Sequence, residues 1–407
     1  MITLLILIYL SFISLGLGDS QLGAAWPSMY GLLNVPLHYG GLITMISAGG
    51  TVVSAIFCGK IIKRFGTVKV ILLGFLLTAS ALLGFSFSNY YIMLCLFAVP
   101  LGLGGGAIDV SLNNYVALHY KARHMSWLHC FWGVGASIGP IIMSAFLIHR
   151  NSWNESYRAI GIVHFCIIVL LILSLSLWKK SETVKSGSHS EPSSPNNPND
   201  NPEKNNLLKS DSANFKKVLS ITGVKEALLI FFFYCSVETI TAFWGASYLV
   251  TVKGIAKEAA AAAISLYFIG ITSGRFISGF VSIKLNNRQM VRIGQLIIGC
   301  GIITLVLPFG NSVLLPGLFL IGLGCAPIFP SLLHETPKNF GKEYSHIIIG
   351  LQMGCAYIGT SVMPPFFGWL TKITSFNIFP IFIGVILIIK IILAEIMNKK
   401  VDKKIII

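Results

Sequence analysis

Long apolar segments constrain this chain more than any other feature. A helix that crosses a bilayer needs about 20 predominantly apolar residues. With 54% hydrophobic and only 11% charged residues, the chain lies outside the composition of soluble domains. The sequence therefore predicts an all-α membrane protein with twelve transmembrane helices, near residues 3–28, 39–62, 67–88, 90–117, 126–148, 157–178, 225–250, 258–283, 290–309, 312–333, 345–370 and 376–397.

Positive charges are concentrated on one side of the predicted membrane. When the loops are assigned alternately to the two sides, most Lys and Arg fall on the side that holds residues 60–69, 121–123, the central loop, 284–292, 338–342 and 399–404. By the positive-inside rule, we expect that side and both termini to be cytoplasmic, with the protein in the cytoplasmic (inner) membrane. The net charge of +15 then reflects topology, so the expected partner is the lipid bilayer and not nucleic acid.

A polar segment divides the chain into two halves of similar sequence. Residues 179–217 are rich in Ser, Pro and Asn without apolar periodicity, which predicts a cytoplasmic and partly disordered linker. The halves, 1–178 and 218–407, each hold six predicted spans. An offset of 220 residues aligns Gly59 with Gly279, Gly102–Gly104 with Gly322–Gly324, and Ala136–Gly139 with Ala356–Gly359. We therefore predict two pseudo-symmetric six-helix bundles.

Three carboxyl side chains stand out because they lie away from the ends of predicted spans. An ionisable side chain at the centre of a span costs at least about 2.5 kcal/mol, so it normally faces a cavity or a partner. Asp19 and Asp109 have no basic residue in their own spans, and a carboxyl group that titrates as water access changes is what proton coupling requires. Glu238 could be a third coupling residue. The alternatives are a hydrated Asp19 at the outer mouth, a helix-packing role for Asp109, and a gate role for Glu238.

Polar side chains near Asp109 are candidates for substrate binding. Asn113 follows Asp109 at the i, i+4 spacing that places side chains on one helical face, and Asn114 is next to it. His129 in the fifth span could bind substrate or relay protons, because histidine titrates near neutral pH. The alternative for all three residues is hydrogen bonding between packed helices.

Other polar residues lie near the predicted cytoplasmic surface. We expect Arg275 either to reach that surface from the eighth span or to bridge the two halves. His334 and Glu335 end the tenth predicted span, where they are expected to be solvated.

The duplicated halves and one loop resemble the major facilitator type of secondary transporter. That family has two six-helix halves joined by a cytoplasmic loop, with the substrate site between them. The segment GKIIKRFGTVK at residues 59–69 resembles the family's loop signature, with matches at Arg64, Phe65, Gly66 and Lys69. Lys63 stands where the family usually has an acid. The resemblance implies a gating role for Arg64 and Gly66, and Arg275 is a further gating candidate from its position near the cytoplasmic end of its span.

Spans one, four and five resemble the fucose permease branch of sugar:proton symporters. That branch has an acid in span one, matched by Asp19, and an acid followed by Asn-x-Tyr in span four, matched by Asp109 and Asn113-Asn114-Tyr115. Its amide in span five is replaced here by His129. The resemblance implies proton-coupled monosaccharide transport. Further side chains that suit a sugar, through ring stacking or hydrogen bonds, are Trp26, Trp132, Trp244 and Gln352.

These features together predict a proton-coupled secondary transporter, most simply a sugar:proton symporter that works by alternating access as a monomer. The coupling ion would be H⁺, with no cofactor and no metal. Two alternatives remain open: a proton-driven efflux carrier for a nonsugar amphipathic compound, and a nontransporting nutrient sensor. An enzyme is not expected, because the sequence has no nucleophile-base set and its eight cysteines have no metal-ligand spacing.

Overall fold

A computed structural model of the protein describes residues 2–120, 122–175, 177–178, 217–307 and 313–406. Among these residues, twelve helical spans are long and apolar enough to cross a membrane, as predicted. The predicted linker lies outside the described residues except for Lys217. The helices are α1 (Ile2–Asp19), α2 (Gln21–Leu32), α3 (Gly40–Phe65), α4 (Thr67–Ser86), α5 (Tyr91–His119), α6 (Ala122–Arg150), α7 (Trp153–Leu173), α10 (Val224–Thr251), α11 (Lys257–Val281), α12 (Asn287–Val306), α13 (Leu314–Cys325), α14 (Ile328–Phe340), α15 (Lys342–Ile373) and α16 (Phe379–Ile406).

The first and tenth spans are each interrupted. Helices α1 and α2 form one span that breaks at Ser20, and α13 and α14 form another that breaks at Ala326 and Pro327. Because a proline lacks a backbone donor, the second break is expected at that position. The first break has a consequence for the site, because it places Asp19 at the last position of α1.

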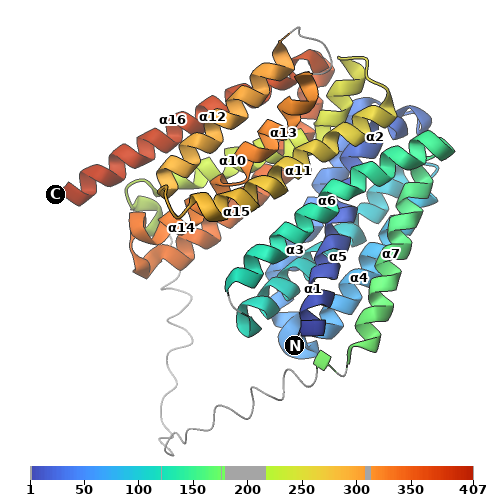
Figure 1. Cartoon of the computed structure of the whole chain (residues 1–407), viewed down its shortest axis with the longest axis horizontal. Coiled ribbons are helices and arrows are strands. Elements are labelled where there is room, and N and C mark those ends of the chain that lie inside the picture. Colours follow the sequence, from blue (N-terminus) through green and yellow to red (C-terminus); the bar gives the residue numbers. More distant parts are fainter. Residues whose placement is uncertain (1, 121, 176, 179–216, 308–312, 407) are drawn as a thin grey trace, which may run out of the picture.

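The two halves repeat one another in their packing as well as in their sequence. The backbone of Gly102 in α5 packs on the carbonyl group of Ser47 in α3, and Gly322 in α13 packs in the same way on Tyr267 in α11. Each pair of positions is related by the 220-residue offset. Glycine is needed at both contacts, since any side chain would overlap the neighbouring backbone. These contacts confirm the pseudo-symmetric architecture (Figure 1).

The bundles meet mainly where α6 packs on α11, α3 on α15 and α2 on α10. We call the end with the α3–α4 turn and the linker attachments the linker side, and the other end the opposite side. On the opposite side the contact is tight, because Gly23 packs on Phe243 and Gly41 packs on Pro365. Toward the linker side, α3 and α15 border a gap of about 510 Å³. The protein is therefore open toward the linker side.

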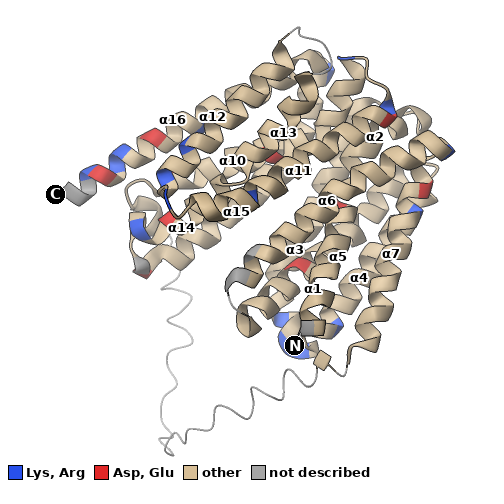
Figure 2. Cartoon of the chain, in the orientation of Figure 1, with Lys and Arg blue, Asp and Glu red and all other residues tan. Residues whose placement is uncertain are grey.

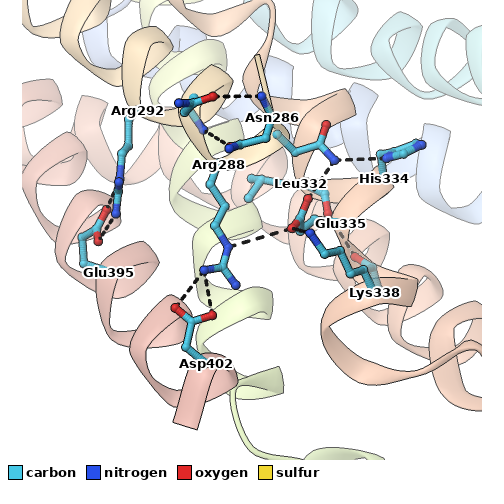
Figure 3. A network of polar contacts seen from close by, with 12 residues as sticks. Asn286, Arg288, Arg292, Leu332, His334, Glu335, Lys338, Glu395 and Asp402 are labelled. Atoms are coloured by element: carbon cyan, nitrogen blue, oxygen red, sulfur yellow. Dashed lines mark hydrogen bonds and ion pairs between the residues drawn. The ribbon is translucent and has the colours of Figure 1, made fainter. Parts of the chain in front are cut away.

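Ion pairs tie the C-terminal bundle together on the linker side (Figure 3). Arg288 at the start of α12 lies between Asp402 of α16, at 2.8 Å, and Glu335 of α14, at 3.9 Å. Arg292 binds Glu395 of α16 through two parallel hydrogen bonds of 2.8 and 2.7 Å. The prediction that Glu335 is a solvated terminus is wrong, because α14 continues to Phe340 and buries this carboxylate.

The corresponding end of the N-terminal bundle carries cations without acidic partners. Lys60, Lys63, Arg64 and Lys69 are all exposed, and none forms an ion pair with a described residue. Figure 2 shows blue segments gathered near the N-terminus, while blue and red segments alternate along the end of α16. The two bundles therefore differ most on the linker side.

Candidate functional site

The break after α1 brings Asp19 to an indole of α6. The Nε1 atom of Trp132 donates a hydrogen bond of 2.9 Å to Oδ2 of Asp19. Although Asp19 lies within a membrane span, its side chain is exposed. Asp19 contacts α6, and α6 packs on the other bundle. We infer that the exposed Asp19 carboxylate borders the space between the two bundles.

Asp109 and Asn113 form a second polar pair, on α5. The Nδ2 atom of Asn113 donates to Oδ1 of Asp109 at 2.8 Å and lies 2.9 Å from the backbone oxygen of the same residue. Both side chains are half-buried. Asn114 is exposed and is rotated by about 100° from Asn113 around the helix, so it does not share this face.

The two carboxyl groups lie in the same part of the molecule. Asp19 and Asp109 are close enough for an electrostatic interaction between them. Tyr357 of α15, which lines the gap between α3 and α15, is within electrostatic range of Asp109. The structure thus brings together residues that are distant in the sequence, on α1, α5 and α6, and faces them toward a helix of the other bundle.

Arg275 of α11 bridges the two bundles at this site. Its guanidinium lies 5.5 Å from the Trp132 ring, and its Nη1 atom is 3.4 Å from the backbone oxygen of His129. The His129 ring packs edge-on against Phe12 at 6.0 Å, and no described side chain forms a hydrogen bond with it. Trp132 therefore touches both the Asp19 carboxylate and the Arg275 cation. This indole is therefore one of the contacts between the bundles.

Glu238 of α10 lies in the C-terminal bundle, where its side chain is half-buried. The hydroxyl group of Tyr267 donates to the backbone oxygen of Glu238 at 3.0 Å. Among the described residues, no hydrogen bond or ion pair involves the Glu238 carboxylate. Its electrostatic neighbours include Tyr234, Cys235, Tyr267 and Cys325. Glu238 thus lacks the second carboxylate that Asp19 and Asp109 provide for each other.

Two tryptophans lie outside the gap. Trp26 and Trp244 are both fully buried, and each donates its indole N–H to a backbone oxygen, of Leu37 at 2.6 Å and of Pro364 at 2.9 Å. Both belong to the tight contact on the opposite side. The expectation that they line the central cavity is therefore wrong for this conformation, because their rings pack between helices.

Gln352 belongs to a different part of the molecule. It is buried, and its Oε1 atom accepts a hydrogen bond of 3.0 Å from Thr336. It lines a small polar pocket at the linker-side end of the C-terminal bundle, together with Gln295 and Glu335. The interpretation of Gln352 as a substrate-binding residue of the central site is wrong in this conformation, since α15 turns it into its own bundle.

The predicted gating residues of the α3–α4 turn are exposed. Arg64 stacks over the adjacent Phe65 ring at 5.3 Å. Gly66 has a φ of +85°, which favours glycine, and its N–H closes α3 by donating to Ile62 at 2.8 Å. Among the described residues, no hydrogen bond or ion pair joins either residue to the other bundle.

Two buried ionisable residues were not identified from the sequence. Lys390 of α16 is 1% exposed, its Nζ atom has no hydrogen-bond partner, and it lies 5.4 Å from the Tyr234 ring. His164 of α7 is also buried, with Nδ1 at 3.1 Å from Ser14 and 3.0 Å from the backbone oxygen of Ile160. Each interrupts a long apolar run, and a search for single charged or titratable residues within spans would have found both.

Comparisons with known proteins agree with this architecture. The glucose/mannose transporter GlcP of Bacillus subtilis is 23% identical over 372 residues, which cover 89% of this chain and 86% of that protein. The proton-coupled antiporter flippase LtaA of Staphylococcus haemolyticus is 25% identical over 122 residues, 28% of this chain and 31% of that protein.

Solved structures share the fold. The crystal structure of a D-xylose-proton symporter matches with a TM-score of 0.73 at 13% identity, covering 98% of this chain and 97% of that one. A peptide transporter POT in complex with sulfate matches with a TM-score of 0.71 at 14% identity, covering 97% and 93%. The sequence profile of the Major Facilitator Superfamily matches residues 8–364 and 226–404. The chain therefore belongs to the Major Facilitator Superfamily, whose members are membrane transporters and not enzymes.

Proposed function

We propose that this protein is a monosaccharide:proton symporter that works by alternating access. The observation that carries the proposal is the polar site between the bundles, where Asp19 and Asp109 interact with each other and each accepts a hydrogen bond from a neutral side chain. Carboxyl groups that are reached by water from one side at a time can take up a proton on one side and release it on the other.

The residues at the site divide into proton and substrate roles. Asp19 and Asp109 carry the coupled proton, and Glu238 is a third proton-coupling residue, in the opposite bundle. Asn113, Trp132 and His129 bind the sugar, because amide, indole and imidazole groups form hydrogen bonds with hydroxyls and the indole face stacks on a sugar ring. Asn114 joins them only if α5 rotates. Coupling requires only that protonation change the relative stability of the two conformations.

Further expectations complete the proposal. The linker side is cytoplasmic, with both termini, so this conformation is open to the inside of the cell. The protein acts as a monomer in the inner membrane, with H⁺ as the coupling ion and without a cofactor. The similarity to a glucose/mannose transporter supports a monosaccharide as substrate.

The test is proton movement into proteoliposomes during addition of a panel of hexoses, deoxyhexoses and pentoses. An internal pH dye should report acidification with one class of sugar, and the Asp109→Asn variant should lose this signal while still exchanging labelled sugar. Wild-type-like proton movement in Asp109→Asn would remove Asp109 from the coupling mechanism.

A second candidate is efflux of an amphipathic compound. The gap between α3 and α15 is lined mainly by apolar residues and glycines, among them Val52, Ile56, Met353 and Ile358, which suits an apolar substituent better than a free sugar. If correctly folded and inserted protein responds to no sugar in the panel, efflux of such a compound becomes the better explanation.

A further inference from the structure

Helices α3 and α15 pack in a defined register on the opposite side. The backbone of His38, just before α3, lies against Gly368, and Gly41 lies against Pro364 and Pro365. The two helices run antiparallel. Each residue further along α3 toward the linker side is therefore paired with the residue one position earlier in α15. Two adjacent contacts define this register.

The residues that line the gap continue the register. It sets Gly49 opposite Tyr357, Val52 opposite Gly354 and Ile56 opposite Gly350, and all six residues line the gap. Their spacing of three and four residues is that of two helices packing face to face. We call these two facing rows the seam.

The two rows of the seam are apart in this conformation, but their residues would allow close contact. Gly350 and Gly354 have no atom within 4 Å of the position where a side chain would begin, and Ile56 is 67% exposed. Two glycines spaced by four residues let helix backbones approach closely inside a membrane. An open row of glycines on one helix, facing an exposed isoleucine on the other, indicates a contact that forms in another conformation.

When the α3–α15 register is extended toward the linker side by about two helical turns, it reaches two residues of opposite charge. It sets Lys63, in the last turn of α3, opposite Glu343, in the first turn of α15. Both side chains are exposed, and neither forms an ion pair with a described residue in this conformation. Other charged residues nearby in the sequence are Lys60 and Arg64 on α3 and Lys342 next to Glu343, and Lys217 is a further cation near Glu343. Tyr344 and, more weakly, Glu343 raise the pKa of Lys217, so Lys217 competes for this carboxylate.

We propose that Lys63 and Glu343 form an ion pair between the bundles when the linker side closes, and that this pair helps to hold the outward-facing conformation. The pair accounts for a lysine at the position where the loop signature usually has an acid. It rests on the proposed function only in that the linker side must close during transport. Since the register ends in one cation and one anion, closure brings opposite charges together.

Carbodiimide cross-linking of the native chain in membranes tests the pair directly, because the reagent joins an amine and a carboxylate only when they meet. We expect an amide between Lys63 and Glu343, identified by mass spectrometry of the joined peptides. Lys400 and Glu226, which are paired within the C-terminal bundle, provide the positive control. Lys69, which is exposed in the same turn but off the seam, provides the negative control. Cross-linked Lys400–Glu226 without Lys63–Glu343, or with Glu343 joined only to Lys217, overturns the proposal.

Charge reversal gives a second test. Lys63→Glu and Glu343→Lys should each lower uptake by about fivefold, because each sets like charges opposite one another at closure. The double variant K63E/E343K should recover most of the loss, and Lys69→Glu should have no effect. Impaired single variants without recovery in the double variant argue against the pair. The cross-link needs no substrate, so a positive cross-link with no sugar uptake would reject the proposed substrate and keep the pair.

Discussion

The two bundles share one packing scheme but distribute their ionisable residues differently. The glycine contacts of the N-terminal bundle recur in the C-terminal bundle at the same offset. Yet the N-terminal bundle holds the two candidate carboxyl groups Asp19 and Asp109, each with a side-chain hydrogen bond, whereas the C-terminal bundle contributes Glu238 as its candidate and buries Lys390 without a hydrogen-bond partner. Backbone packing is thus the shared property of the halves, and the chemistry is specific to each half.

The linker side shows the same asymmetry. In the C-terminal bundle, the cations of α12 pair with acids of α14 and α16, and Lys400 of α16 pairs with Glu226 of α10. These pairs connect four helices of one bundle and should make them move as one body. The exposed cations of the N-terminal bundle are left available for partners that arrive when the conformation changes.

The largest expected effect is a difference in transport between variants of the carboxyl groups in the two bundles. Asp19→Asn should abolish sugar accumulation driven by a pH gradient, because Asp19 and Asp109 interact and neutralising one removes a charge that the other senses. Glu238→Gln should lower accumulation less, by about tenfold at most, since no carboxylate neighbours Glu238. Both variants are compared by uptake of labelled sugar into proteoliposomes with an imposed pH gradient.

Exchange of labelled for unlabelled sugar at equal pH is the control, because it requires binding and conformational change but no net proton movement. Both variants should exchange at near wild-type rates. If Glu238→Gln abolished pH-driven accumulation and Asp19→Asn did not, the proton pathway would lie in the C-terminal bundle.

Lys390 offers a test in which stability should rise. An amine that is buried without a hydrogen-bond partner costs free energy, and methionine has a similar shape without the charge. Lys390→Met should therefore increase the free energy of unfolding by about 1–3 kcal/mol, measured by thermal unfolding in detergent. Lys372→Met, which changes an exposed lysine of the same bundle, should change it by less than about 0.5 kcal/mol.

The two outcomes of this test have different meanings. A stabilised variant that no longer transports would show that Lys390 is kept for function at a cost in stability, as expected for an ionisable residue inside a membrane. A destabilised variant would show that the amine has a favourable partner, for which the Tyr234 ring at 5.4 Å is the nearest candidate.

The fold and part of the site followed from the sequence for physical reasons. Apolar length alone identifies spans, and Asp19 and Asp109 were identified because isolated acids are costly in a bilayer. The positions of Trp26 and Trp244 were wrong, because an aromatic ring suits a buried helix contact as well as a cavity wall. Glu335 was misplaced because the tenth span continues past it, and the polar end of an amphipathic helix resembles a loop in composition.

The contacts between the bundles were beyond prediction. Arg275 was expected either to reach the surface or to bridge the halves, and only the crossing of α6 and α11 distinguishes these outcomes. Trp132 joins Asp19 to Arg275 through the same crossing. Such contacts depend on how two rigid bodies meet, and hydrophobic periodicity within one helix carries no information about that.

The smallest expected effect concerns the ion pairs of the linker side. Arg292 holds Glu395 with both nitrogens, but the two side chains are 56% and 37% exposed, and exposed pairs contribute only about 0.2–1 kcal/mol. Arg292→Gln should lower the free energy of unfolding by an amount in that range, and high salt should remove the difference. Arg64→Gln, at the turn of the other bundle, has no acidic partner to lose in this conformation and should leave stability unchanged. Equal destabilisation by both variants would mean that the N-terminal cations also pair in the dominant conformation. That result would place the closed linker side, and not the open one, as the resting form of the protein.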